Sequence, residues 1–383
     1  MYQAIKTLTQ VSWVRTLYWV ISLSVYGYMA FEMSTFDKST DKAFKIRLLA
    51  SLFLIFVLPK IFLVIFLLID DILRMFTFGY QYLKTGNSDY VERRKFLSLM
   101  GLGLGALFAG LFTDGIFFGK FRHKVRKVKL KIAHLPNSFK GYKILQISDV
   151  HSGSFSDPAK LQKAIHLINE QNADLIVFTG DMVNTLSSEF KPFIELFSSI
   201  QSKDGKLSVL GNHDYGDYHK WENTQLKQKN FEDLLKYEKQ AGFDILLNEN
   251  RIIEKNGEKI YILGVENWGL PPFPQYGDLE KSMLNVPKDA VKILMSHDPT
   301  HFDEVVKKYP SHVHLTLSGH THGMQFGIDL KNIKWSPAQF RYKKWADLYE
   351  SNGRYLYVNR GFGVIGYPGR VGVLPEITVF ELS

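Results

Sequence analysis

The chain has 383 residues, a formal net charge of +9 and no cysteine. The lack of cysteine excludes thiolate ligands from any metal site, and it fits either side of a membrane. Seven of the positive charges stand within residues 120–131, and removing them leaves +2, so the basicity is local.

Three apolar stretches occupy the first third of the chain, at residues 11–33, 48–69 and 96–119. Each approaches the roughly 20 residues needed to cross a bilayer. Pro59-Lys60 interrupts the second stretch, which predicts a kinked span or a pair of shorter elements. Small residues in the third would let a neighbouring helix approach closely: Gly101, Gly103, Gly105 and Gly110. We therefore predict a membrane region over residues 1–119 with about three transmembrane helices, rather than core helices of a soluble domain.

The orientation of this region follows from the run Glu92-Arg93-Arg94-Lys95-Phe96-Leu97-Ser98. It resembles a twin-arginine export signal, and the alternative is a basic flank that obeys the positive-inside rule. Both interpretations place residues 93–95 inside and residues 120–383 outside, and with three spans the N terminus would also be inside. The loop 34–47 would then also be outside, although it is rich in lysine. We expect a multi-pass protein of the bacterial cytoplasmic membrane with an extracytoplasmic domain.

A basic stretch follows the third apolar segment, and its charges alternate with apolar residues as in a strand. We predict an edge strand of a sheet, where lysine discourages unwanted pairing. The same charges could rest on anionic head groups, at about 1 kcal/mol each. Nucleic acid binding is the weakest alternative, because no aromatic residues interleave with the charges. The charged residues are Lys120, Arg122, Lys124, Arg126, Lys127, Lys129 and Lys131.

Residues 120–383 have the pattern of one α/β domain. Helices are expected at 158–171, where Asp157 is a cap and Pro158 opens the first turn, and at 190–200 and 230–240. Short apolar runs with β-branched residues, ending in Gly, Asp or Asn, predict buried strands between them. These runs lie at 143–147, 175–178, 207–210, 291–295 and 313–317, with late strands at 355–358 and 377–382.

A cluster of polar residues follows each of the five buried strands. In open α/β sheets, ligands bind beyond the carboxyl ends of the strands, so these clusters are expected to converge on one crevice. Isolated histidines elsewhere are interpreted as surface or packing residues, with His314 the least certain. The clusters are Asp149-Val150-His151, Gly180-Asp181, Gly211-Asn212-His213-Asp214, Ser296-His297-Asp298 and Gly319-His320-Thr321-His322.

The residue types in these clusters suit a pair of metal ions. Imidazole and carboxylate are ligands for Mn, Fe or Zn. Two ions roughly 3.5–4 Å apart must share a ligand, and Asp181 on its Gly-Asp turn is the candidate bridge. Asn212 would be a neutral ligand through its carbonyl oxygen. His320 and His322 are two apart in an extended segment, so both project to the same side.

In this order, the clusters resemble those of the calcineurin-like metallophosphoesterase family, and within it the membrane-anchored or exported bacterial branch. The resemblance runs from about residue 127 to the end of the chain and implies a two-sheet β-sandwich flanked by helices, an α/β/β/α fold. It implies one metal on Asp149, His151, Asp181 and His322, and a second on Asp181, Asn212, His297 and His320. It also implies that His213 is a catalytic residue and not a ligand.

One position departs from the family pattern. Asn184 stands where the family often has aspartate, three residues after Asp181, so we expect the hydrogen bonds around the site to differ there. We expect Asp214 either to orient a neighbouring histidine or to face water as a turn carboxylate. Arg360 is expected to contact phosphate or to pair with a carboxylate.

The expected activity is that of a metal-dependent phosphoric ester hydrolase. A hydroxide held by the metals would attack phosphorus, the metals would neutralise phosphoryl oxygens, and His213 would stabilise or protonate the leaving oxygen. The substrate would be a phosphodiester or phosphomonoester of lipid or cell-envelope origin. Two loops, at 215–229 and 267–276, carry aromatic residues and proline that either cover an apolar group of the substrate or pack at the surface.

Two alternatives remain open at this stage. A hydrolase of a UDP-sugar-lipid pyrophosphate would need the site to face the cytoplasm. A non-catalytic membrane binding protein with a vestigial metal site is the other, and the intact ligand pattern argues against it.

Overall fold

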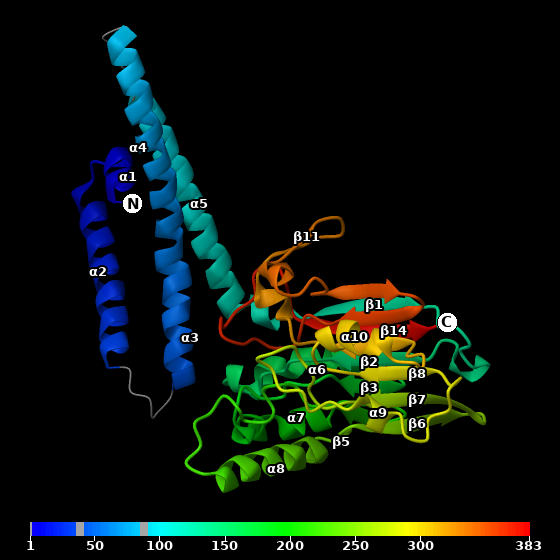
Figure 1. The fold of residues 1–383 in the computed structure, drawn as a ribbon. Helices are drawn as coiled ribbons and strands as arrows, with labels where there is room; N and C mark the ends of the chain where they lie inside the picture. Colours follow the sequence, from blue (N-terminus) through cyan, green and yellow to red (C-terminus); the bar gives the residue numbers. More distant parts are fainter. Residues whose placement is uncertain (1, 36–41, 85–90) are drawn as a thin grey trace. The chain divides into compact units, whose positions relative to one another are not determined.

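The structure, a computed structural model, describes residues 2–35, 42–84 and 91–383 (Figure 1). The chain divides into two compact units, Met1–Phe117 with Gly366–Gly369, and Phe118–Ile365 with Arg370–Ser383. Of the described residues, those of the first unit are mainly helical, and those of the second form two large sheets with helices around them.

The first unit contains a helix at each predicted apolar stretch. Two helical runs, Lys45–Ile69 and Phe96–Phe121, are long and apolar enough to cross a membrane. The described helices are α1 (Tyr2–Leu8), α2 (Ser12–Ser34), α3 (Lys42–Leu52), a π-helical turn (Phe53–Val57), α4 (Leu58–Lys84) and α5 (Val91–Phe117).

The expected span at residues 11–33 is not among those two runs. Its helix α2 forms as predicted, but serine, tyrosine and tryptophan dilute its apolar character. The loop charges Asp37, Lys38 and Asp41 lie outside the described residues. Arg93 and Arg94 lie in the first turn of α5, but their side chains are likewise outside the description.

The second stretch is one continuous helical run with a wide turn just before Pro59. Proline lacks an N–H and crowds the preceding turn, and a π-helical turn accommodates it. Lys60 also has partners there, because its Nζ donates to Ser22 Oγ at 2.9 Å and lies over the rings of Tyr18 and Tyr26. The second apolar stretch is therefore not divided into two separate shorter helices.

Two of the four glycines in α5 allow the close helix approach that the sequence predicts. A side chain at Gly101 would collide with Leu63 of α4, and one at Gly105 would touch Pro59. Gly103 and Gly110 have no described neighbour within 4 Å of such a side chain. Gly101 and Gly105 are therefore the glycines of α5 at which α4 approaches closely.

The second unit contains two six-stranded sheets. The first has the order β1 (Lys124–Leu130), β14 (Glu376–Leu382), β2 (Lys143–Ile147), β3 (Leu175–Phe178), β4 (Lys206–Ser208) and β5 (Phe243–Ile245). The second has the order β12 (Asp347–Ser351), β13 (Arg354–Val358), β9 (Leu315–Ser318), β8 (Lys292–Met295), β7 (Glu258–Gly264) and β6 (Glu249–Lys255). A small hairpin pairs β10 (Ile328–Asp329) with β11 (Lys334–Trp335).

The basic stretch lies where the sequence predicts it. β1 is an edge strand of the first sheet, and the last strand of the chain, β14, separates it from β2 (Figure 1). β14 runs parallel to β1 and antiparallel to β2. Within this stretch, Arg126 pairs with Glu376 at 3.1 Å and Lys129 pairs with Glu381 at 3.5 Å.

The second unit has four layers, helices, sheet, sheet and helices, and a large hydrophobic core lies between each layer and the next. Between the sheets, Val177 and Leu207 of the first sheet pack with Ile293 of the second in one buried cluster. The outer face of the first sheet is covered by α6 (Gln162–Asn169), α7 (Ile194–Ser198) and α8 (Thr224–Gln240). The outer face of the second is covered by α9 (Leu279–Ser282) and α10 (Thr300–Glu304). The predicted α/β/β/α sandwich is confirmed.

The predicted helices differ from the observed ones mainly at their starts. Asp157 caps a 3₁₀ turn by accepting from Ala159 N at 2.9 Å, and α6 continues from that turn. α8 begins six residues before the predicted 230, because Asn223 caps it by accepting from Leu226 N. The 3₁₀ turns are Gly119–Phe121, Asn137–Phe139, Ser152–Ser154, Pro158–Leu161, Ser187–Glu189, Lys191–Phe193, Val306–Lys308, His322–Gln325 and Pro337–Phe340.

Candidate metal centre

The predicted ligands all lie just beyond strand ends, as the sequence indicates. Parallel pairing of β2, β3 and β4, and of β8 and β9, places their carboxyl ends at common sheet edges. Backbone hydrogen bonds join the loops, from Asp149 N to Gly180 O at 2.8 Å and from Gly319 N to His297 O at 2.9 Å. The residues are Asp149 and His151 after β2, Asp181 after β3, Asn212 after β4, His297 after β8, and His320 and His322 after β9.

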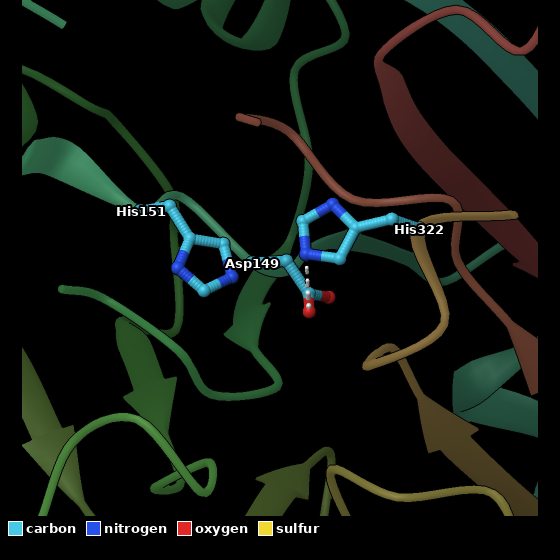
Figure 2. A group of neighbouring side chains, drawn as sticks. All are labelled: Asp149, His151 and His322. Carbon is cyan, nitrogen blue, oxygen red and sulfur yellow. Dashed lines mark ion pairs between the residues drawn. The ribbon is translucent and has the colours of Figure 1, made fainter. Parts of the chain in front are cut away.

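Two trios of side chains could each hold a metal ion. In the first, Asp149, His151 and His322 offer one ligand atom each, all within 4.8 Å of one another. Figure 2 shows the Asp149 carboxylate below the ring of His322, with the ring of His151 to the left. His322 Nε2 lies 3.2 Å from Asp149 Oδ1. All three side chains are buried.

The second trio consists of Asp181, His297 and His320, gathered within the same limit. Asp181 Oδ2 lies 3.1 Å from His297 Nε2 and 3.5 Å from His151 Nε2. Asp181 therefore contacts a histidine of each trio. This is the position that a ligand shared by two ions must occupy.

The ligand loops require unusual backbone conformations. Five of the predicted ligands have φ between 47° and 69°, in the left-handed region that is uncommon for non-glycine residues. Such conformations are kept where the surrounding structure enforces them, typically at functional sites. The five are Asp149, His151, Asp181, His320 and His322.

Two positions in the motifs need glycine, because the backbone there lies too close to these carboxylates for a side chain. A side chain on Gly211 would overlap the Asp181 carboxylate, and one on Gly319 would overlap Ser148 and Asp149. The glycines of the Gly-Asn-His and Gly-His-X-His motifs therefore allow the neighbouring loop to bring its carboxylate into the site.

Hydrogen bonds fix which ring nitrogen faces the ligand cluster. His297 Nδ1 lies 2.7 Å from the carbonyl oxygen of Thr179 and donates to it, which leaves Nε2 toward Asp181. His320 Nε2 lies 2.8 Å from Tyr342 Oη, which leaves Nδ1 3.2 Å from His297 Nε2. A second hydrogen bond of this kind orients a ligating histidine and fixes its tautomer.

The donor atoms fit divalent metal ions. Within the described part of the chain, both nitrogens of His151, Nε2 of His322 and Oδ1 of Asn212 are buried without a hydrogen-bond partner. Buried polar atoms nearly always have a partner, so atoms that converge without one are typical of ligand sites. Nitrogen and oxygen donors suit Mn, Fe or Zn.

Burial and charge set the protonation of the ligands. Burial lowers the pKa of His151 well below its ordinary value, so the ring is neutral at pH 7 as a metal ligand must be. Burial opposes ionisation of Asp149, but the neighbouring His322 and His297 outweigh it and hold its pKa below the ordinary value. Burial also disfavours charge on His297, yet Asp181 raises its pKa to about 10, so metal binding would displace that proton.

His213 lies beside the ligands but belongs to neither trio. Its Nδ1 is 2.7 Å from the main-chain oxygen of Asn184, and its ring is 5.0 Å from that of His151. The Asn184 side chain bonds instead to Ser154 Oγ at 3.2 Å. The main-chain oxygen of Asn184, and not its side chain, therefore orients His213.

Asp214 does neither of the two things expected of it. It is fully buried, and its carboxylate accepts backbone N–H groups from Gly211, Asp181 and Met182, each at 2.8 Å. Burial, with the charge of Asp181, raises its pKa to about 7, although the N–H donors oppose this. Asp214 therefore fastens the loop after β4 to the loop after β3.

Several residues near the centre could not be assigned from the sequence. Tyr342 supports His320, and the buried Arg370 lies with one guanidinium nitrogen 3.2 Å from His322 Nδ1. Arg341 stands with its guanidinium 5.0 Å from the ring centre of Phe273. None belongs to a motif, and each reaches the site only through the folding of the last third of the chain.

Of the two roles expected for Arg360, the structure shows pairing with carboxylates. It is fully buried and bonds to Glu376 at 2.7 Å, Asp347 at 2.7 Å and Asp329 at 3.0 Å. His314 is a packing residue whose Nδ1 accepts from Lys292 N at the opposite end of β9 from the ligands.

The two aromatic loops do approach the site. Tyr218 Oη accepts from Asn212 Nδ2 at 2.8 Å, and its ring lies 4.5 Å from that of His213. Phe273 stands edge-on to His320 at 4.7 Å. Trp221 and Trp268 pack instead against His219 and His301.

A two-sheet sandwich with histidine and aspartate gathered at its strand ends defines a metallophosphoesterase. Residues 142–324 match the family described as Calcineurin-like phosphoesterase, and residues 1–120 match Probable Calcineurin-like phosphoesterase, transmembrane domain. The chain belongs to the calcineurin-like phosphoesterase family, in its membrane-anchored branch. The resemblance seen in the sequence is confirmed.

Relatives occur in bacteria and animals. An uncharacterized metallophosphoesterase of Bacillus subtilis, YkuE, is 32% identical over 302 residues, which are 76% of this chain and 98% of that protein. Phosphodiesterase YaeI of Escherichia coli is 27% identical over 67% of this chain and 87% of its own length. The Danio rerio transmembrane protein with metallophosphoesterase domain is 28% identical over 68% of this chain, which spans 57% of that protein.

Proposed function

We propose that this chain is a membrane-anchored phosphoesterase that uses two divalent metal ions to hydrolyse a phosphodiester or phosphomonoester of lipid or cell-envelope origin. The observation that carries the proposal is the pair of trios around Asp181, buried except for the partly buried His320, with nitrogens and an amide oxygen left without partners. In this proposal residues 1–119 are the membrane anchor and residues 120–383 the catalytic domain.

The proposed ligand sets follow the two trios. Asp149, His151, Asp181 and His322 would hold one ion, and Asp181, Asn212, His297 and His320 the other. Two bound ions would polarise the phosphoryl oxygens and supply a nucleophilic water at neutral pH. Because Asn212 is neutral, it would leave the second position more positive toward an anionic substrate.

His213 is proposed to assist the leaving group. Its Nδ1 is committed to Asn184 O, so only Nε2 is available to the substrate. A protonated ring donates from Nε2 to the departing oxygen, which neutralises its developing charge. Tyr218, packed on that ring, limits its rotation.

The proposed substrate follows from the surroundings of the site. The rings of Phe273 and Tyr342 lie against His320 and that of Tyr218 lies against His213, and these aromatic surroundings favour a phosphoester with an apolar group. The match of residues 1–120 to a transmembrane domain supports a membrane-associated substrate. We further propose that the protein lies in the bacterial cytoplasmic membrane with this domain outside, on the evidence of Arg93, Arg94 and Lys95 before the last apolar run.

The test uses the full-length chain, purified in detergent and stripped of metal. Hydrolysis of bis-p-nitrophenyl phosphate is measured after addition of Mn or Zn, and bound metal is counted by elemental analysis. The variants are Asp181→Ala and, as a matched control, Asp289→Ala, an exposed carboxylate on the loop before β8.

The proposal expects close to two ions per chain and metal-dependent turnover that Asp181→Ala lowers by roughly 100-fold or more, with Asp289→Ala unchanged. Metal bound without turnover of any phosphoester would favour a binding protein. No metal bound by the wild type would overturn the dimetal proposal itself.

A further inference from the structure

A group of exposed apolar side chains lies on the segment that directly follows the ligands His320 and His322. Phe340 is 81% exposed, Leu330 60% and Ile333 59%. Large apolar side chains gathered at a surface mark a place that contacts something other than water. The group, here the hairpin patch, consists of Met324, Ile328, Leu330, Ile333, Trp335 and Phe340.

The β10–β11 hairpin gives this patch an apolar tip. Ile328 is paired with Trp335 across the hairpin, so both side chains lie on one face. Leu330 N donates to Ile333 O at 3.0 Å, which closes the turn and leaves these two side chains at its end. Figure 1 shows the hairpin standing out from the sandwich as a loop.

The charged residues of the same segment are almost all basic. Between Met324 and Lys343 there are four cationic side chains, Lys331, Lys334, Arg341 and Lys343, and one acid. That acid, Asp329, is already paired with Arg360 at 3.0 Å and with Arg126. Of the cations, Lys334 is paired with Asp347, so Lys331, Arg341 and Lys343 supply the positive charge beside the apolar tip.

The segment is fixed to the candidate metal centre. Ser336 Oγ donates to Gly323 O at 2.6 Å, and Tyr342 Oη contacts His320 Nε2. Next to the exposed Phe340, Arg341 lies over Phe273, whose ring in turn stands against His320. A continuous row of side chains thus runs from the patch to the ligands.

We propose that the hairpin patch inserts into the head-group boundary of an anionic phospholipid bilayer. Apolar and aromatic side chains enter such a boundary, and the basic residues around them meet the lipid phosphates. A second copy of the chain is the less suitable occupant, because a two-fold contact would bring Lys331, Arg341 and Lys343 of both copies together. The bilayer is that of the transmembrane domain matched by residues 1–120.

Insertion would deliver a lipid phosphate along Arg341 and Phe273 to the metal centre. This delivery rests on the proposed function, whereas the insertion itself does not. The test therefore measures insertion without metal or turnover, so that its failure and the failure of the hydrolase proposal are separate results.

The absence of native cysteine permits a clean experiment on the full-length chain. Leu330→Cys is labelled with an environment-sensitive nitrobenzoxadiazole dye, and the protein is placed in nanodiscs that contain nitroxide-labelled lipid. The matched control is Leu284→Cys, a leucine with the same 60% exposure. The main-chain oxygen of Leu284 accepts a hydrogen bond from Asn250 of β6. β6 is the edge strand of the second sheet opposite β12.

In phosphatidylglycerol nanodiscs the dye at 330 is expected to shift to the blue and to be quenched at least about threefold more than the dye at 284. Phosphatidylcholine nanodiscs, or Ile333→Glu in the Leu330→Cys chain, should reduce that quenching toward the control. Equal quenching at 330 and 284 would overturn insertion, and equal quenching in both lipids would overturn the anionic surface. A blue shift that grows with protein concentration in detergent would assign the patch to a second copy.

Discussion

His213 donates through Nδ1 to the main-chain carbonyl oxygen of Asn184, 2.7 Å away. The bond leaves Nε2 as the only ring nitrogen that can meet a substrate. Because the acceptor is backbone, the residue type at position 184 does not determine the orientation of this ring.

The first prediction separates the roles of these two residues. His213→Ala should lower kcat by about 10²–10⁴-fold, because a positioned proton donor contributes that much. Asn184→Ala should stay within about threefold of wild type, since the carbonyl that orients the ring is retained. Steady-state kinetics on a diester, at saturating metal, measure both.

The leaving group provides the control for this prediction. An alkoxide needs protonation far more than p-nitrophenolate does, so the loss in His213→Ala should be larger for an alkyl ester than for the nitrophenyl ester. Equal losses for the two esters would contradict a role in protonating the leaving oxygen.

Tyr342→Phe tests the support of His320. The change removes the hydroxyl 2.8 Å from His320 Nε2 and should weaken metal affinity by about 10–100-fold, as loss of an outer partner of a ligating histidine does. Metal titration of the activity and of bound metal measures the change, and excess metal should restore turnover. The control is Tyr309→Phe, because Tyr309 packs against the hydrophobic core between α10 and the second sheet. A fall in activity that excess metal does not restore would argue that Tyr342 contacts the substrate instead.

The strands and ligands were accessible from the sequence because their signals are local. β2 and β3 begin and end at the predicted residues, since each is a buried apolar run ended by polar turn residues. The ligand positions follow from those ends, because parallel strands share a sheet edge. The ligand assignments themselves stay predictions until metal is measured.

The rest depends on contacts between distant parts of the chain. β14 enters the first sheet between β1 and β2, and no local pattern specifies that position. The carboxylates around Arg360 and the support of His320 by Tyr342 likewise form only when the last third of the chain folds back. The left-handed conformations of the ligands could not be predicted either, because residues other than glycine rarely adopt them.

Glu238 allows a prediction on pH and stability. It is fully buried in α8, and burial, then the charge of Asp214, raise its pKa well above the ordinary value. A raised pKa means that the stability from this group is complete below about 4.5 and is lost as pH rises toward the folded value. Glu238→Gln removes this titration, so the variant should gain about 1.4 kcal/mol over wild type per pH unit within that window.

Thermal unfolding between pH 4.5 and 8 measures this difference. The Gln side chain can keep the bond from Ser208 Oγ, which is 2.7 Å from Glu238 Oε2. Glu232→Gln, on the exposed side of the same helix, should follow the wild-type curve. Parallel curves for wild type and Glu238→Gln would show that Glu238 ionises normally in the folded protein.

The proposed orientation predicts that the catalytic domain is reached from outside an intact cell. Leu284→Cys is the only thiol in its chain and is well exposed, so a membrane-impermeant maleimide should label it without permeabilisation. A cytoplasmic thiol protein in the same cells should stay unlabelled, which checks the membrane barrier. Labelling only after permeabilisation would reverse the orientation and place the site where UDP-sugar-lipid pyrophosphates are accessible. That result would leave the metal chemistry intact and change the substrate class to be screened.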